Sequence, residues 1–118
     1  MDKELLVSVI IPAFNCENTI IDTLNSVINQ TIKHFEIIVI DNNSSDNTLN
    51  KISKVNDKRI RILNCYKQSP AAARNLGIKN SNTDIIAFLD ADDIWFRSKL
   101  EKSLNTLKKY DFVYHDLT

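Results

Sequence analysis

The sequence predicts an α/β fold with a mostly parallel, Rossmann-like sheet flanked by helices. Short runs rich in valine and isoleucine alternate with segments whose apolar residues recur at helical spacing. One run, residues 85–89, is apolar without interruption, as expected of a strand that is covered on both faces. Turn and capping residues separate the segments. The resulting order βαβαβαβαβ favours a sheet with right-handed crossovers.

The first expected strand covers residues 7–11 and stops at Pro12, because proline cannot donate a hydrogen bond to a neighbouring strand. The second, residues 36–40, is predicted to be buried and ends at Asp41. In the third, residues 59–63, polar and apolar side chains alternate, which indicates a more exposed strand. The remaining two strands are expected at residues 83–89 and 112–114.

Four helices are expected from apolar residues spaced three or four apart. Asn18 or Thr19 can cap the first helix, and Ser44 or Ser45 can cap the second. The pair Ser69-Pro70 is typical of a helix start and predicts where the third begins. The apolar positions that define the four helices are Ile20, Leu24, Val27 and Ile28; Leu49, Ile52 and Val55; Ala72, Ala73, Leu76 and Ile78; and Phe96, Leu100, Leu104 and Leu107.

Length and charge narrow the class of protein. A chain of 118 residues is expected to form one domain. Its 15 basic and 15 acidic residues cancel, and nucleic-acid-binding motifs are absent, so we expect no nucleic-acid partner. Cys16 and Cys65 lack the spacing of metal ligands and are expected to be free thiols in a reducing compartment. No apolar run approaches the length of a membrane span. We therefore expect a cytoplasmic protein and leave peripheral membrane contact open.

Three carboxylates, Asp90, Asp92 and Asp93, directly follow the apolar run at residues 85–89. Like charges at this spacing repel one another and cost stability. A divalent cation between them would remove that cost, and oxygen ligands of this kind suit magnesium or manganese, which often also hold phosphates. Because a helix cap needs one carboxylate and not three, we predict a metal and diphosphate site here.

Polar residues also follow two other predicted strands, at Phe14-Asn15 with Glu17 and at residues 41–43. In an open α/β sheet, ligands bind beyond the carboxyl ends of the strands. We therefore expect these residues and the acidic cluster to meet in one crevice. Asn43, Ser44 and Ser45 are better explained as turn or capping residues.

Several other side chains allow two interpretations. Arg74, one turn into the third helix, could clamp a diphosphate or lie on a solvated helix face. Trp95 and Phe96 could wall a sugar pocket, but a role in the core is favoured. His34 and His115 have no partner nearby in the sequence and are expected at the surface or in ordinary packing.

Five segments, in order and with suitable spacing, carry a family resemblance. They are residues 7–15 (VSVIIPAFN), 26–31 (SVINQT), 36–46 (EIIVIDNNSSD), 72–78 (AARNLGI) and 86–93 (IAFLDADD). Together they resemble the inverting family 2 glycosyltransferases of the GT-A fold. The resemblance covers nearly the whole chain, and it makes the Rossmann-like sheet one of the GT-A type, truncated after the donor-binding part.

The resemblance implies transfer of a sugar from a nucleoside diphosphate, expected to be UDP, to a hydroxyl acceptor with inversion. The acceptor would be a glycan or a lipid-linked group in bacterial cell-surface polysaccharide or glycan synthesis. A manganese or magnesium ion on Asp90, Asp92 and Asp93 would neutralise the departing diphosphate. The residues that would line the donor site are Pro12, Ala13, Phe14, Glu17, Asp41, Asn42, Arg74, Asp90 and Asp92.

The chain departs from the family pattern within its second segment. Where the family commonly has a second aspartate and then glycine, this chain has Asn42 and Asn43. The second aspartate often reads the base, so Asn42 leaves the base preference open. Asn43 tolerates the left-handed backbone that glycine would supply.

The chain also departs from the family in length. Members normally continue further, and the later part supplies the acceptor site and the general base. Neither Asp111 nor Asp116 resembles that base, so no catalytic residue is identified within the chain and the base is expected beyond Thr118. Residues 1–118 are therefore expected to be a donor-binding N-terminal domain, a fragment of a longer chain that is inactive alone.

Two alternatives stay open at this point. A nucleotidyltransferase shares the architecture and the metal, but it usually has a glycine-rich, basic loop after the first strand. In this chain residues 12–15 follow the first strand, and they include no glycine, because Gly77 is the only glycine in the chain. A phospho-receiver signalling domain has a similar length, but it places paired acids after its first strand. In this chain the principal acids follow the second and fourth predicted strands.

Overall fold

The structure, a computed structural model, describes residues 5–109 and contains one four-stranded sheet. All the strand pairs are parallel, and the spatial order is β3-β2-β1-β4. The predicted α/β class is therefore confirmed. The strands are β1 (Val7–Ala13), β2 (Phe35–Asp41), β3 (Ile60–Asn64) and β4 (Ile86–Phe88).

Some predictions concern the last residues of the chain, which lie outside the described residues. They include the strand predicted at residues 112–114 and the prediction that His115 lies at the surface or in ordinary packing. The two acids Asp111 and Asp116 also lie there, as does Thr118, beyond which the general base is expected. The structure therefore tests none of these predictions, and the location of the base stays a prediction.

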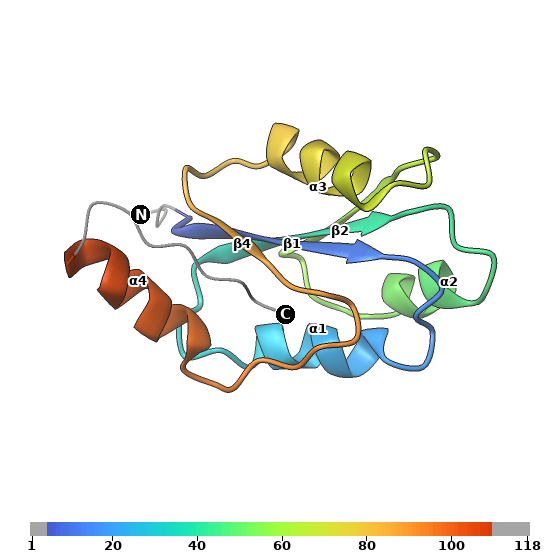
Figure 1. The fold of residues 1–118 in the computed structure, drawn as a ribbon. Helices are drawn as coiled ribbons and strands as arrows, with labels where there is room; N and C mark the ends of the chain where they lie inside the picture. Colours follow the sequence, from blue (N-terminus) through green and yellow to red (C-terminus); the bar gives the residue numbers. More distant parts are fainter. Residues whose placement is uncertain (1–4, 110–118) are drawn as a thin grey trace.

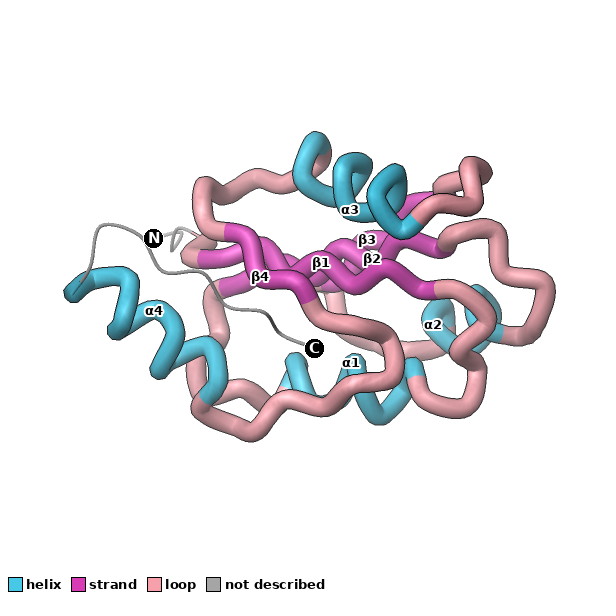
Figure 2. The backbone as a smooth tube through the Cα atoms, viewed as in Figure 1, coloured by secondary structure: helices cyan, strands magenta, loops and turns pink. Residues whose placement is uncertain are grey.

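Helices lie on both faces of the sheet (Figure 1). One face carries α1, α2 and α4, and the other carries α3, which gives three layers that are also visible in Figure 2. No helix in the described part of the chain combines the length and the apolar character needed to cross a bilayer. The helices are α1 (Ile20–Ile28), α2 (Thr48–Ser53), α3 (Pro70–Lys79) and α4 (Lys99–Lys109).

The core is divided into two parts by the sheet, because successive side chains of a strand point to opposite faces. Val9 and Ile11 of β1 pack with Leu24 of α1 in the larger part. Ile10, between them in the sequence, packs with Ala73 of α3 in the smaller part. These contacts place α1 and α3 on opposite faces of the sheet.

Gly77 allows α3 to approach the sheet closely. A Cβ atom at this position would lie 2.6 Å from Cγ2 of Ile10, well inside van der Waals contact. The only glycine of the chain therefore serves helix packing. Because α3 leads from β3 across the sheet to β4, this close approach also helps to place the first turn of α3 beside the end of β1.

Strand β1 continues two residues further than predicted, through Pro12 to Ala13. The backbone groups of every second residue in a strand point to the same neighbour. The amide of Ser8 and the carbonyl of Ile10 both bond on the β4 side, so the backbone nitrogen of Pro12 points to that side too. Strand β4 has already ended there, since its last residue pairs with Ile10. Proline is tolerated because no neighbouring strand requires its missing N–H.

Strand β4 is shorter and less buried than predicted. It covers only Ile86–Phe88 of the expected residues 83–89, and all three residues are half-buried. Among the described residues it pairs with β1 alone, so it lies at an edge of the sheet and not at its centre. The apolar run indicated a strand correctly but could not indicate how many neighbours that strand has.

The predicted helix starts are right for α1 and α3 and wrong for α2. Ser69 caps α3 by accepting a hydrogen bond from the amide of Ala72 at 3.2 Å, as predicted. Thr19 precedes α1 but makes no capping bond with its side chain. Helix α2 begins after Ser44 and Ser45, and the Asp46 carboxylate accepts from the amide of Thr48 at 3.0 Å.

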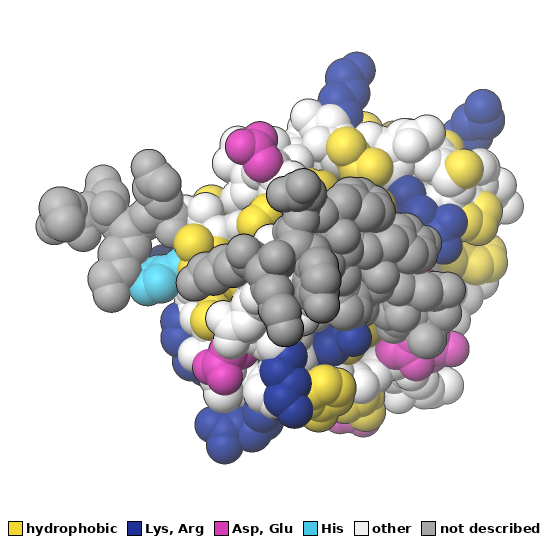
Figure 3. Space-filling model, turned by 60° about the vertical axis from the view of Figure 1, so that its left-hand side comes forward, with side chains coloured by type: hydrophobic (Ala, Val, Ile, Leu, Met, Phe, Trp, Pro, Cys, Tyr) yellow, Lys and Arg dark blue, Asp and Glu magenta, His cyan; other side chains and the backbone are white. Residues whose placement is uncertain are grey.

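The fourth helix begins at Lys99, after the predicted first position Phe96. Phe96 lies before this helix and is 57% exposed, whereas Trp95 is buried in the core. The favoured interpretation of core packing is therefore right for Trp95 and wrong for Phe96. On the face shown in Figure 3, basic and acidic side chains are intermixed in the part coloured by residue type, and no broad basic surface is visible there.

Candidate functional site

A pocket of about 540 Å³ opens at the carboxyl edge of the sheet. The chain builds β1, β2 and β3 outward in one direction and then places β4 on the other side of β1. The end of β1 is thus a topological switch point, where open α/β sheets bind ligands. The pocket is lined by residues 12–16, 18–19, 42, 70, 74 and 90–92.

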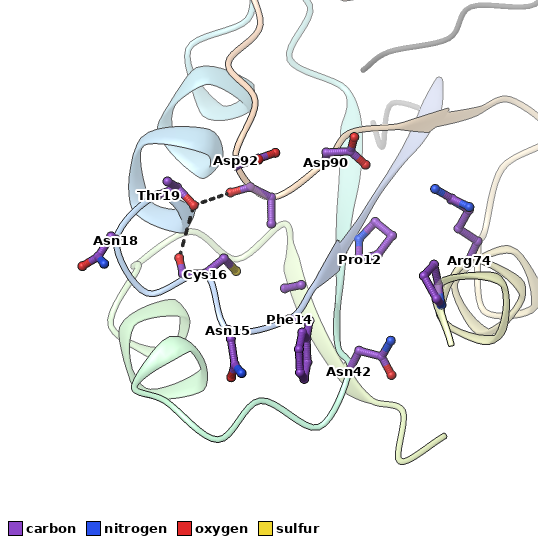
Figure 4. Close-up of a pocket in the computed structure, with 13 residues that line it drawn as sticks. Pro12, Phe14, Asn15, Cys16, Asn18, Thr19, Asn42, Arg74, Asp90 and Asp92 are labelled. Carbon is purple, nitrogen blue, oxygen red and sulfur yellow. Dashed lines mark hydrogen bonds between the residues drawn. The ribbon is translucent and has the colours of Figure 1, made fainter. Parts of the chain in front are cut away.

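Most of the predicted donor-site residues meet in this pocket (Figure 4). They come from four separate elements, which confirms that the strand ends converge on one crevice. Asp90 and Asp92 follow β4, while Arg74 lies on α3 across the pocket from them. The predicted residues that line the pocket are Pro12, Ala13, Phe14, Asn42, Arg74, Asp90 and Asp92.

Two of the predicted donor-site residues, Asp41 and Glu17, do not line the pocket, and neither does the predicted metal ligand Asp93. Asp41 is buried, and its Oδ1 accepts a hydrogen bond from the amide of Ser44 at 3.3 Å. Glu17 points to a neighbouring turn, where its Oε2 accepts from the amide of Asn47 at 3.1 Å. Both carboxylates are held by backbone N–H groups, so they shape the turns beside the pocket without facing it.

The three carboxylates after β4 form a compact group. One oxygen from each of Asp90, Asp92 and Asp93 can be chosen so that all lie within 4.8 Å of one another. The loop that carries them is closed by a hydrogen bond from the amide of Asp93 to the carbonyl of Asp90 at 3.0 Å. Three hard oxygen donors at this separation fit the coordination of magnesium or manganese.

Two threonine hydroxyls hold the backbone of this acidic loop. Thr19 and Thr23 each donate to the carbonyl of Ala91 at 2.9 Å, and Thr23 is also 2.7 Å from the carbonyl of Asp93. Figure 4 shows Thr19 near Asp92, and Thr23 is fully buried. The two hydroxyls thus fix the backbone of the acidic loop from the α1 side.

The same line of polar residues along α1 continues to bind the chain that follows. Ser26 accepts a hydrogen bond from the amide of Trp95 at 3.2 Å. The side chain of Gln30 donates to the carbonyl of Phe96 at 2.7 Å and accepts from the amide of Leu100 at 3.0 Å. An irregular segment is thus fixed by side chains of α1 and of the turn that follows it, in place of strand pairing.

This polar line was not among the features predicted from the sequence. Its signal was the helical spacing of Thr19, Thr23, Ser26 and Gln30, which places them on one side of the first helix. The spacing shows that the four side chains share a face. It does not show that their partner is a segment about 70 residues away.

Asn15 lines the pocket, as expected of the polar residues that follow the first strand, although it was not assigned to the donor site. It has a left-handed backbone, with φ 46°, as does Asn43, with φ 61°, where this conformation was predicted. The Oδ1 atom of Asn15 accepts from the amide of Ser45 at 2.8 Å, while its own amide donates to Oγ of Ser44 at 3.0 Å. These bonds join the turn after β1 to the turn after β2.

Cys16 lines the pocket without being an activated nucleophile. Burial raises the pKa of its thiol, and the hydrogen bond with Thr48 offsets this only in part. The thiol therefore stays protonated at neutral pH. Cys16 and Cys65 are both free, as predicted.

The fold and site define a Rossmann-like α/β domain with a ligand pocket and an acidic group at its switch point. The chain belongs to the family Glycosyl transferase family 2, because residues 8–116 match the sequence profile of that family. This membership confirms the resemblance of the five segments. It sets aside the nucleotidyltransferase and phospho-receiver alternatives.

Relatives of this chain include bacterial glycosyltransferases. It is 43% identical over 112 residues to the Escherichia coli UDP-Glc:alpha-D-GlcNAc-diphosphoundecaprenol beta-1,3-glucosyltransferase WfgD, covering 94% of this chain and 44% of that protein. It is 42% identical over 103 residues to the putative teichuronic acid biosynthesis glycosyltransferase TuaG of Bacillus subtilis, covering 84% and 40%. The chain thus spans less than half the length of these curated relatives.

A solved structure shares the fold. TarS 1–349 of S. aureus, in complex with UDP-GlcNAc, aligns with a TM-score of 0.83 and 28% sequence identity. The alignment covers 91% of this chain and 32% of that one. The predicted GT-A type of fold is therefore confirmed.

Proposed function

We propose that this chain binds the nucleoside-diphosphate sugar, expected to be UDP-linked, that a family 2 glycosyltransferase uses as its donor. One observation carries the proposal: three carboxylates gather within 4.8 Å at the rim of a pocket that Arg74 also lines. Such a group is costly for the fold unless a cation binds there. A diphosphate between the cation and an arginine satisfies both charges.

The position of each residue suggests its role in this proposal. Pro12, Ala13 and Phe14 line the pocket where β1 ends and would contact the base and ribose. Arg74, on the opposite wall, would contact the phosphates. Glu17 and Asp41 would act indirectly through the turns that they hold.

Asp90, Asp92 and Asp93 would hold the divalent cation, manganese or magnesium. When bound, such an ion neutralises charge on a departing diphosphate as a Lewis acid. Thr19 and Thr23 would keep the three carboxylates directed toward it, because they bind the loop carbonyls from the other side.

For the whole protein we propose inverting sugar transfer to a hydroxyl of a glycan or lipid-linked acceptor, in bacterial cell-surface polysaccharide synthesis. The names of the relatives WfgD and TuaG support this pathway class, and the name of WfgD includes a polyprenyl diphosphate acceptor. A lipid-linked acceptor would place the full protein in the cytoplasm at the membrane surface.

Isothermal titration calorimetry with UDP tests the donor site. We expect binding that requires Mn²⁺ and is lost in Asp92→Ala, because that change removes one of the three oxygen ligands. Asp84→Ala is the matched control: it removes an exposed carboxylate at the opposite edge of the sheet and should leave binding unchanged. Equal, metal-dependent binding by Asp92→Ala would remove Asp92 from the site.

A second experiment tests the division between donor binding and catalysis. We propose that a general base beyond Thr118, in the part of the family fold that follows this chain, deprotonates the acceptor. Residues 1–118 alone should then bind UDP but transfer no sugar from a UDP-sugar to an added acceptor. Robust transfer by the 118-residue chain would contradict this division and place the base before Thr118.

A further inference from the structure

The segment that leads from the acidic loop into α4 exposes two large apolar side chains. Ile94 is 67% exposed and Phe96 is 57% exposed, whereas Trp95 between them is buried. In Figure 1 this orange segment runs along the lower edge of the fold. Scattered exposed apolar residues are common, but neighbouring ones that are framed by polar residues are typical of an interaction surface.

The fold fixes this exposure, because the backbone of the segment is hydrogen-bonded on the α1 side. The amide of Trp95 and the carbonyl of Phe96 bond to side chains of α1 and of the turn after it, at 3.2 and 2.7 Å. The carbonyl of Arg97 accepts from the amide of Thr31 at 3.0 Å. The two exposed apolar side chains therefore cannot turn inward without the loss of these bonds.

Two lysines of α4 lie close to the ring of Phe96. The Nζ atom of Lys102 is 5.4 Å from the ring centroid, and that of Lys99 is 5.9 Å from it. At these distances the face of an aromatic ring attracts an ammonium group. Lysine stems can also cover apolar surface while their charge stays in water, which suits the boundary between water and lipid.

Two further basic residues lie beside Ile94. Lys33 and Arg97 line a cavity of about 610 Å³ together with Ile94. Within residues 5–109, the ion pairs belong to Arg59 and Arg61, so none of these four basic side chains is paired with an acid. The residues that we call the apolar–basic surface are Lys33, Ile94, Phe96, Arg97, Lys99 and Lys102.

The charge of the apolar–basic surface indicates the kind of partner that covers it. Its basic side chains outnumber the neighbouring carboxylates, which are Asp22 in the cavity lining and Glu101 in the first turn of α4. An anionic lipid bilayer offers negative charge to the basic groups and an apolar interior to Ile94 and Phe96. The surface also begins one residue after Asp93, so a bilayer there would lie near the acidic group.

We propose that the apolar–basic surface docks the protein on an anionic lipid bilayer. Ile94 and Phe96 would insert among the lipid headgroups, and the basic side chains would lie near the lipid phosphates. The inference rests on the proposed function for its purpose, because a lipid-linked acceptor has to be reached from the bilayer. The contact itself depends on this surface and not on the donor pocket.

Co-sedimentation with lipid vesicles tests the contact. We expect the full-length protein that contains this chain to bind vesicles of phosphatidylglycerol and phosphatidylcholine in equal parts. Binding to vesicles of phosphatidylcholine alone should be at least about tenfold weaker, because each basic residue near an anionic surface contributes about fivefold. Equal binding to both kinds of vesicle, or binding to neither, would overturn the proposal.

The variant Phe96→Ser tests the apolar part of the surface. It removes an exposed ring outside the core clusters, so the fold should be kept. Binding to the anionic vesicles should fall by about tenfold or more, as expected for the loss of one inserted ring. Ile78→Ser is the matched control, since Ile78 is an exposed apolar residue of α3 on the opposite face of the sheet. Equal binding by the two variants would overturn the proposal.

The variant Lys102→Glu tests the basic part, with Lys79→Glu of α3 as its matched control. Reversal of the charge at Lys102 should weaken binding to the anionic vesicles by more than about tenfold, and the control should change it by no more than a few-fold. Equal losses in both variants would mean that net charge alone drives binding, and would overturn the assigned surface.

Titration with UDP and Mn²⁺ separates this proposal from the donor site. All four variants should bind UDP as the wild type does, because none of them alters the pocket. Retained UDP binding without vesicle binding in the wild type would overturn the membrane contact and leave the donor site standing. Vesicle binding without UDP binding in the wild type would do the reverse. If the wild type instead forms a dimer that Phe96→Ser disrupts, and binds no vesicles, a second copy covers the surface and the proposal is wrong.

Discussion

The two edges of the sheet use acidic residues in opposite ways. At the amino edge, Glu36 of β2 is 5% exposed and is surrounded by donors. Ser8 donates to it at 2.6 Å, the backbone and side chain of Asn82 donate at 2.6 and 3.0 Å, and Arg61 lies at 3.4 Å. This carboxylate joins three strands and the chain before β4.

At the carboxyl edge, three carboxylates are brought near one another. Asp90 and Asp93 are half-buried and Asp92 is exposed, with one oxygen of each within 4.8 Å of the others. A buried charge that is matched by hydrogen-bond donors supports the fold. Like charges gathered at a pocket are better explained by a ligand. The two edges should therefore respond in opposite directions when an acid is neutralised.

The largest effect is expected at the amino edge. Glu36→Gln should lower the free energy of unfolding by about 2–3 kcal/mol, because hydrogen bonds to a buried charge are lost and one donor faces another. Urea unfolding measures the loss, and binding of UDP with Mn²⁺ should not change. Glu101→Gln makes the same change at an exposed position and should have little effect. If Glu36→Gln loses no more unfolding free energy than Glu101→Gln, the proposed difference between the two edges of the sheet is wrong.

The same residue predicts how stability depends on pH. Burial tends to raise the pKa of Glu36, but hydrogen bonds from Ser8 and Asn82, with the nearby Arg61, lower it below its ordinary value. The unfolded chain therefore binds a proton first as the pH falls. The stability that Glu36 contributes is present above about pH 4.3 and is lost as the pH falls below it. In urea unfolding at decreasing pH, the free energy of unfolding should fall less steeply for Glu36→Gln than for the wild type. The same pH dependence in both proteins would mean that other titratable groups cause the loss of stability.

A smaller effect is expected where α1 holds the acidic loop. Thr23→Val removes a buried hydroxyl close to the carbonyls of Ala91 and Asp93, and should cost about 1–2 kcal/mol of unfolding free energy. Affinity for Mn²⁺ should fall about tenfold, because the carboxylates are less well positioned. Calorimetry with Mn²⁺ alone measures this.

Thr48→Val is the control for Thr23→Val, since Thr48 is equally buried and its hydroxyl bonds in a different turn. It should cost stability without a comparable loss of Mn²⁺ affinity. If both variants weaken Mn²⁺ binding equally, the effect reflects general loosening of the fold and not support of the acidic loop.

The smallest effect is expected at the carboxyl edge, with the opposite sign. Asp93→Asn should raise stability by up to about 0.5 kcal/mol in the presence of a chelator, because it removes one of three like charges. With Mn²⁺ added, the wild type should gain stability and the variant should gain less. Thermal unfolding with and without the ion measures both. A variant that is less stable than the wild type in chelator would contradict the repulsion.

Much of the fold followed from the amino-acid pattern. Apolar spacing in residues 20–28 and 70–79 indicated helices, and the polar residues after the strands indicated a shared crevice. These predictions succeed because they depend on the periodicity of a local segment and on the rule that parallel strands end at one edge. The acidic group was predicted for the same reason, since repulsion among Asp90, Asp92 and Asp93 is visible from their separation in sequence alone.

What the local pattern could not contain is the choice of distant partners. The edge position of β4, the continuation of β1 through Pro12, and the capture of the acidic loop by Thr23 all depend on which segments become neighbours. Periodicity determines which face a side chain occupies, whereas its hydrogen-bond partner is decided only when the layers are packed together.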